Sequence, residues 1–204
     1  MKKQRETGFT LVELSLAMTF LAFIMVFVVV VLIQIMNIYN KGIAMTQINQ
    51  TGRQVADDLN SSVRFATPGS VTYLAANNRL CTGQVSYLWN IDGGTTNTFS
   101  DNSAIGVVRI RDSVSDYCND VNLKPSLTNT NVTVLSGPSV GILEFTVDTA
   151  PSFIRINMVL STSGNNKPVY SSGKWSCLGS GGSGSNPYCA FANFDNTIYM
   201  RGGQ

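Results

Sequence analysis

Histidine is absent from this chain of 204 residues. Its absence excludes Ser-His-Asp and Cys-His catalysis and every histidine-ligated metal site. The chain also contains no GxxxxGK[ST] phosphate-binding loop, so any ATP-driven step would need a separate motor. The few lysines form no local motif with serine that indicates Ser-Lys chemistry. We therefore expect no enzymatic activity, no metal and no cofactor.

Charged side chains are absent from residues 14–40, which contain no Asp, Glu, Lys or Arg. Residues 14–33 alone are long enough to cross a bilayer as a helix. Glu13 lies at the edge of this run. A carboxylate deep in hydrocarbon costs roughly 2.5 to 3.5 kcal/mol and usually has a partner or a function. The position of Glu13 explains its charge equally well. It lies near a helix start, where the macrodipole favours an anion, and its side chain can reach the interface.

The residues around Glu13 carry a more specific signal. Residues 8–13 read Gly-Phe-Thr-Leu-Val-Glu and follow a short basic leader with Lys2, Lys3 and Arg5. Together with the uninterrupted apolar run, this stretch resembles the cleavage and methylation signature of type IV prepilins and of the pseudopilins of related secretion and DNA-uptake machines. The resemblance covers about the first 30 residues, and it indicates a mechanism of assembly rather than a biological task.

The resemblance implies that a membrane peptidase cuts between Gly8 and Phe9 and methylates the new amine of Phe9. The apolar segment is retained, in contrast to a secretory signal peptide, whose cleavage site follows the apolar stretch. Glu13 is then expected to pair with the Phe9 amine of a neighbouring subunit, because a buried carboxylate is tolerable when a cation meets it. The implied partners are other pilin subunits, the prepilin peptidase, the lipid bilayer before assembly, and a membrane platform with a separate ATPase.

The leader carries all of the net charge of the chain. Three of the 14 basic residues and one of the 12 acidic residues lie in residues 1–8, which leaves 11 of each. A neutral mature chain argues against a general electrostatic grip on anionic lipid or nucleic acid, so we predict no direct nucleic-acid binding. By the positive-inside rule the leader stays in the cytoplasm and everything after about Lys41 is exported. We expect a single-pass cytoplasmic-membrane protein that then joins a cell-surface pilus or a periplasmic or cell-wall pseudopilus.

All four cysteines lie in the exported part, and an even number outside the cytoplasm favours disulfides. They form no CxxC pair, which argues against zinc. Three pairings are possible, and we expect the local one, Cys81 with Cys118 and Cys177 with Cys189. The second bond would tether a Gly/Ser-rich segment that is too flexible to hold a shape by itself, and closing a loop of this size stabilises a fold by about 3 kcal/mol.

Helical periodicity continues beyond the apolar run. Apolar residues recur at helical spacing among polar ones, namely Ile48, Val55, Leu59 and Val63. We expect the helix to end at about Phe65, just before Pro68 and Gly69. A helix over residues 9–65 would be about 85 Å long, so half of it must protrude from a bilayer. Gly42 and Gly52 each lower local helix stability by up to about 1 kcal/mol, and one of them is a candidate for a bend or a melted turn.

Short strand-like runs separated by turn residues fill the rest of the chain. They are residues 84–89, 105–111, 132–135, 142–147, 153–160 and 197–201. The pattern predicts an antiparallel sheet packed on the exported half of the helix, hence an α+β, pilin-like fold. The expected divisions are a cleaved leader (1–8), a transmembrane and filament-core helix (9–40), an exported amphipathic helix (41–66) and a globular sheet domain with a disulfide-closed C-terminal loop (67–204).

Two weaker patterns are candidates for binding. Asp112, Asp116 and Asp120 are spaced by fours and are compatible with calcium, although they match no EF-hand and a solvated acidic loop explains them equally well. Three aromatic residues near the C-terminal loop could form an adhesive patch or complete a small core, namely Tyr170, Trp175 and Tyr188.

The sequence therefore favours a structural subunit that is trimmed at Gly8 and joins a filament through its apolar helix. The size of the head, Asp57-Asp58-Leu59 late in the helix and the Thr-Ile-Tyr-Met-Arg ending resemble the larger minor pilins and minor pseudopilins; a major pilin is the alternative. The rival from another class is a non-filamentous single-pass receptor or binding module. Motility, adhesion, DNA uptake and secretion are not distinguished.

Overall fold

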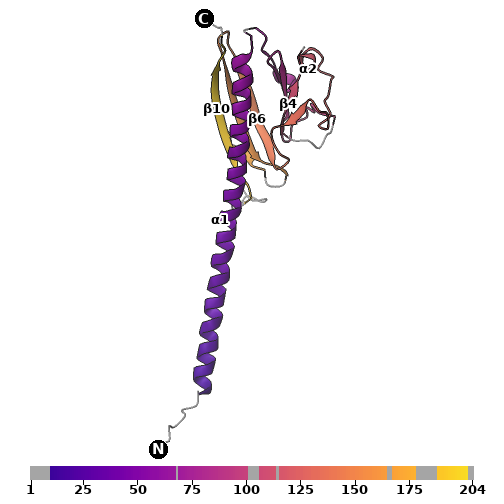
Figure 1. Cartoon of the computed structure of the whole chain (residues 1–204). Helices are drawn as coiled ribbons and strands as arrows, with labels where there is room; N and C mark the ends of the chain where they lie inside the picture. Colours follow the sequence, from indigo (N-terminus) through magenta and orange to yellow (C-terminus); the bar gives the residue numbers. More distant parts are fainter. Residues whose placement is uncertain are drawn as a thin grey trace, which may run out of the picture. The chain divides into compact units, whose positions relative to one another are not determined.

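Helix α1 (Leu11–Phe65) is the longest element of the chain and belongs to both of its compact units, residues 1–40 and residues 41–204 (Figure 1). The computed structural model describes residues 10–67, 69–100, 106–113, 115–164, 167–177 and 188–201. After α1 come β1 (Thr72–Leu74), a 3-10 turn (Ala75–Asn77), β2 (Arg79–Cys81), β3 (Val85–Asn90), β4 (Gly106–Arg111), α2 (Asp116–Asn119), β5 (Val132–Val134), β6 (Val140–Thr149), β7 (Phe153–Thr162), β8 (Val169–Ser171), β9 (Lys174–Ser176) and β10 (Phe191–Tyr199). Helix α1 ends at the predicted residue.

The described residues contain one helix, α1, that is long and apolar enough to cross a membrane, as expected. Within residues 11–40, every side chain except Val31 and Asn40 is largely exposed. In this part of α1, side-chain hydroxyl groups donate to backbone carbonyls of the same helix. Ser15 Oγ donates to the Val12 carbonyl at 2.9 Å, and Thr19 Oγ1 donates to the Ser15 carbonyl at 2.6 Å. These polar groups are therefore satisfied without water.

In the second unit, α1 buries one stripe of its surface. The buried positions are three or four residues apart and include all four predicted ones: Ala44, Ile48, Gly52, Val55, Leu59 and Val63. The apolar members of the stripe join side chains from β6, β7 and β10 in one core. Figure 1 shows these residues' helix, α1, beside β10 and β6. Along β7, the alternate residues Ile154, Ile156, Met158 and Leu160 are all buried in that core.

The strands of the described residues form three sheets, whereas the sequence pattern predicted one. The order is β1-β2-β3-β4-β5 in the largest sheet and β10-β7-β6 in the second, with β8-β9 as a separate hairpin. All strand pairs are antiparallel, as predicted. The larger sheet is buried on both faces: Tyr87, Trp89 and Val107 join the helix core, and a second core contains Leu88, Phe99, Val108 and Ile110.

The strand predictions succeeded where apolar residues dominate. Five of the six predicted runs correspond to β3, β4, β5, β6 and β7, although residue 105 lies outside the described residues. The sixth run, 197–201, was wrong in its bounds, because β10 begins at Phe191 and ends at Tyr199. Asn193, Asp195 and Asn196 have low strand propensity, and they form a strand because β10 pairs with β7 along its whole length.

Neither Gly42 nor Gly52 interrupts α1, contrary to the expected bend or melted turn. A Cβ atom at Gly52 would lie 2.1 Å from Cζ of Phe194, whereas a Cβ atom at Gly42 would meet no atom within 4 Å. The ring of Phe194, on β10, therefore lies directly against the helix backbone at Gly52. Glycine is needed at this position for close packing and not for flexibility.

A polar cluster also joins α1 to the larger sheet. The Tyr87 hydroxyl donates to Asp58 Oδ2 at 2.7 Å and lies 2.6 Å from Ser62 Oγ. Arg109 Nε, on β4, lies 3.4 Å from the same Asp58 oxygen. Burial is the largest cause of the raised pKa of Tyr87, so the hydroxyl keeps its proton and continues to donate. Asp58 thus connects the helix to both β3 and β4.

We expect Gly52→Ala to lower the free energy of unfolding by about 1–3 kcal/mol, because overpacking at Phe194 outweighs the better helix propensity of alanine. Gly42→Ala is the matched control and should raise stability by up to about 1 kcal/mol, because its surroundings are open. Urea unfolding of the full chain in detergent measures both. Equal effects of the two substitutions would show that Phe194 does not restrict position 52.

Candidate assembly site

Glu13 forms a capping box at the start of α1. The Thr10 backbone N–H and the Thr10 hydroxyl each donate to Glu13 Oε2 at 2.9 Å, and the Glu13 N–H donates to Thr10 Oγ1 at 3.3 Å. These bonds satisfy backbone donors that a helix start otherwise leaves unpaired. The sequence carries the signal, since Thr10 and Glu13 stand in the Thr-x-x-Glu spacing. The place of Glu13 near a helix start was predicted, but the capping box was not.

The capping box involves one of the two carboxylate oxygens. No cation among the described residues forms a salt bridge with Glu13. Gly8 and Phe9, the residues of the predicted cut, lie outside the described residues, as do the basic residues of the leader. The geometry is therefore compatible with a second role for the carboxylate, in which an approaching cation meets an acceptor that is already oriented by Thr10.

On both sides of Glu13 in the sequence, α1 presents large apolar side chains to its surroundings. They belong to leucine, isoleucine, valine, methionine and phenylalanine, and they continue from Leu11 to Ile38 with Tyr39 at the end. A helix that is apolar all round is stable in lipid or among other apolar helices, and an exposed apolar surface of this extent indicates such a contact. Within the first unit no described residue outside the helix covers it.

The structure contains both expected disulfides. Cys81 and Cys118 have an S–S distance of 1.94 Å and a Cα–Cα distance of 6.3 Å. The corresponding distances for Cys177 and Cys189 are 2.07 and 5.5 Å. The first bond attaches α2 to β2, and the second joins the residue after β9 to a buried cysteine just before β10. Most of the Gly/Ser-rich segment between the second pair lies outside the described residues.

The three aspartates of the calcium hypothesis do not converge. Asp112 Oδ2 accepts bonds from Ser86 Oγ at 2.6 Å and from the Tyr117 N–H at 3.1 Å, while its Oδ1 accepts from the Asp116 N–H at 2.9 Å. In the part of the chain that the structure describes, no group of three acidic, histidine or cysteine residues is placed to hold a metal ion. The Asp112 carboxylate instead stabilises the start of α2.

A cation does organise this loop, but it is the side chain of Arg79. Arg79 is 2% exposed, and its guanidinium donates to the carbonyl oxygens of Val121 at 2.6 Å and Leu123 at 2.9 Å. It also donates to the carbonyls of Asp120, at 3.1 Å, and Tyr117. Gathered carbonyl oxygens of this kind are also what calcium prefers. Sequence reasoning missed Arg79, because a single arginine in a short strand carries no recognisable motif.

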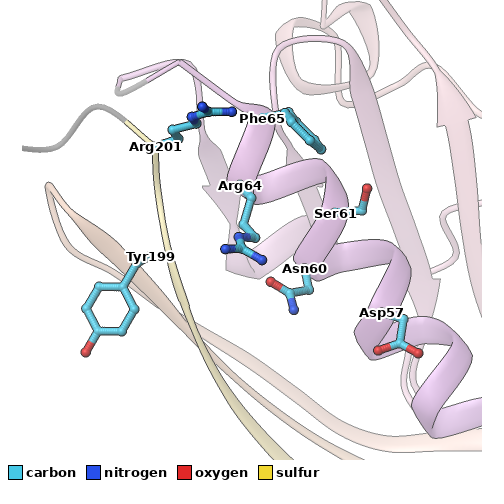
Figure 2. A pocket seen from close by; sticks show the side chains of 7 residues that line it. All are labelled: Asp57, Asn60, Ser61, Arg64, Phe65, Tyr199 and Arg201. Atoms are coloured by element: carbon cyan, nitrogen blue, oxygen red, sulfur yellow. The ribbon is translucent and has the colours of Figure 1, made fainter.

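A surface depression lies where the last turns of α1 meet the end of β10 (Figure 2). Its lining residues are Asp57, Asn60, Ser61, Arg64, Phe65, Tyr199 and Arg201. The Arg201 N–H donates to the Arg64 carbonyl at 3.4 Å, so the end of β10 is fixed to the end of the helix. The lining offers one carboxylate and two guanidinium groups.

The structure brings together two of the three aromatic residues proposed as a patch. Tyr170 and Trp175 face one another across the β8–β9 hairpin, with ring centroids 4.8 Å apart. Neither belongs to the two apolar cores of the described residues. Tyr188 is also exposed.

Comparison with known proteins gives no family model that matches the chain, and no significant match among curated proteins or solved structures.

We expect calcium at millimolar concentration, or its removal with a chelator, to change the melting temperature by less than about 1 °C, since a ligand that does not bind the native state cannot stabilise it. The physical reason is that Asp112 already accepts three bonds and Arg79 occupies the carbonyl cluster. Arg79→Met is the informative variant, because it exposes the carbonyl cluster to solvent ions. A calcium-dependent rise in the wild-type melting temperature would contradict this account.

Proposed function

We propose that this chain is a structural subunit of a type IV pilus or a related pseudopilus, and that its role is that of a minor subunit with a large head. The observation that carries the proposal is the start of α1. An oriented carboxylate stands at the edge of an apolar, exposed helix, and it follows the residues that resemble a prepilin cleavage site.

Cleavage before Phe9 would create a positively charged amine one residue before the cap residue Thr10. In a bundle of apolar helices, an unpaired carboxylate is costly and an unpaired amine is equally costly. A subunit would therefore be held at the height where its Glu13 meets the amine of a neighbour. The apolar side chains supply the contact area, and the charge pair selects the axial position of one helix against the next.

The capping box supports this role in a specific way. A glutamate free to rotate would lose side-chain entropy when it met a partner. In this chain Thr10 already holds Glu13 in one conformation at the first helical turn. The cost of orientation is thus met within the subunit before docking.

We expect the intact mass of the protein from its native cells to correspond to residues 9–204 with one added methyl group, because the leader is removed before assembly. Gly8→Leu should leave the leader attached and abolish filament incorporation while membrane association remains. A full-length mass in cells, with no effect of Gly8→Leu, would favour the single-pass receptor instead.

Three variants separate the charge of Glu13 from its capping role. Glu13→Gln keeps an acceptor for Thr10 but removes the charge, and we expect filament incorporation to fall by at least about tenfold, in line with the cost of breaking a buried pair. Thr10→Ala removes the cap at a cost of about 1 kcal/mol but keeps the charge, so most incorporation should remain. Glu13→Ala loses both functions.

Incorporation is measured by immunoblotting of sheared filaments, with cleavage and membrane insertion checked for each variant. If Glu13→Gln assembles normally and Thr10→Ala does not, Glu13 acts as a helix cap and the docking role is wrong.

A further inference from the structure

The two disulfides of the second unit differ in the contacts that surround them. Each bond joins a fully buried cysteine to a partly exposed one, namely Cys81 to Cys118 in the first bond and Cys189 to Cys177 in the second. Exposure to an external thiol therefore does not distinguish the two bonds. The difference lies in what keeps the two cysteines close together once their bond is open.

Arg79 and Asp112, here called the α2 clamp, hold α2 and its Cys118 in place by hydrogen bonds. Arg79 and Cys81 are two residues apart in β2, so their side chains point to the same face. The Arg79 guanidinium donates to carbonyl oxygens after Cys118, and the Asp112 carboxylate accepts from backbone N–H groups before it. The carbonyls belong to Asp120, Val121 and Leu123, and the N–H groups belong to Asp116 and Tyr117. Cys118 therefore stays beside Cys81 even without the covalent bond.

The second disulfide has no comparable support. Among the described strands, β8 and β9 pair only with each other. In the part of the chain that the structure describes, the hydrogen bonds of residues 169–176 stay within this hairpin. A two-stranded hairpin is marginally stable in water by itself. Once the bond opens, Cys177 is therefore free to move away from Cys189.

The reduction of a disulfide by a monothiol such as glutathione proceeds in two steps. One glutathione thiolate attacks a cysteine sulfur, forms a mixed disulfide and displaces the partner cysteine as a thiolate. A second glutathione thiolate then releases the first cysteine and leaves as oxidised glutathione, so two electrons and two protons pass to the cysteine sulfurs. The second step competes with return of the displaced thiolate. Return is favoured where the two cysteines are held together, because their effective concentration is high.

Ser86 disfavours displacement of Cys81 as well. Its Oγ lies 3.0 Å from Cys81 Sγ and donates its proton to Asp112 Oδ2 at 2.6 Å. The hydroxyl therefore cannot donate to a Cys81 thiolate, which attack on Cys118 would release near a buried carboxylate. Return of the thiolate to the Cys118 sulfur is favoured instead.

We propose that the two disulfides form a graded redox device. A monothiol opens Cys177–Cys189 and frees the β8–β9 hairpin with its aromatic pair, while Cys81–Cys118 stays closed and keeps α2 in place. Mild reduction then changes the surface formed by the hairpin and leaves both apolar cores intact. The device does not depend on the filament role, so the failure of either proposal leaves the other standing.

Equilibration of the full chain in detergent with mixtures of reduced and oxidised glutathione tests the device. The reducing ratio is the squared concentration of reduced glutathione divided by the concentration of oxidised glutathione. Thiols are trapped with acid, alkylated and located by mass spectrometry. We expect Cys177–Cys189 to open at a ratio at least about tenfold lower than Cys81–Cys118, since one hydrogen bond to a charged group changes an equilibrium by about that factor. Equal ratios, or the opposite order, would overturn the device.

Arg79→Met tests the α2 clamp, because it removes the donors to the carbonyls that follow Cys118. We expect its first disulfide to open at a ratio at least about tenfold lower than in the wild type, with the second unchanged. Arg155→Met is the matched control, since Arg155 forms an exposed pair with Asp195, and it should change neither bond. Where circular dichroism shows that Arg79→Met does not fold, Asp112→Asn takes its place. Wild-type ratios in the folded variant would overturn the role of the clamp.

Trypsin cleavage reports the release of the hairpin. Lys174 is exposed in β9, and cleavage after it requires the hairpin to open locally. We expect this cleavage to become faster at the ratio that opens Cys177–Cys189, and cleavage after Arg111, beside the α2 clamp, to keep its rate. An unchanged rate at Lys174 would show that reduction does not free the hairpin.

Discussion

The second unit, residues 41–204 (the head), depends on the apolar stripe that α1 buries from Ala44 to Val63. Without this helix, β6, β7 and β10 would expose one whole face, because three antiparallel strands cannot cover their own apolar side chains. The larger sheet depends on the same stripe through Tyr87, Trp89 and Val107. Gly52 sets the closest approach, since only a residue without Cβ admits the ring of Phe194. The same contacts therefore determine where the buried stripe of α1 and the two larger sheets lie relative to one another within this unit.

Helix α1 has two parts of different composition. Up to Asn40 its apolar residues surround the helix and its hydroxyl groups bond to its own backbone, a solution that works where water is absent. From Lys41 the helix buries one stripe, from Ala44 to Val63, and most of its polar residues face solvent. Glu13 combines both demands, because it completes the helix start as a cap and leaves a charge at the boundary of the apolar surface.

Local sequence patterns, namely the spacing of apolar residues and the positions of turn residues, predicted the end of α1, its buried stripe and most of the central strands. The long β10 was not predicted in full, because its asparagines and aspartate are tolerated only through pairing with β7. The division into separate sheets was missed, since β3 and β4 are buried on both faces and show no alternation. Arg79 and the Phe194–Gly52 contact were also missed, because each depends on residues far apart in sequence. The capping box, in contrast, could have been predicted from residues 10–13 alone.

Residues 52–64 of α1 and β10 run in the same direction, since Phe194 lies against Gly52 and the Arg201 N–H donates to the Arg64 carbonyl. This common direction has a mechanical consequence. A pulling force applied to the helix at Lys41 acts nearly along the strands of the β10-β7-β6 sheet, whose hydrogen bonds lie across that direction. Such a force loads the bonds between neighbouring strands in shear, so many must yield at once, whereas a force across the strands would open them one by one. The two disulfides, which attach α2 to β2 and the hairpin to β10, limit how far the chain could extend after the first strand gave way. The head is thus built to bear tension along its helix.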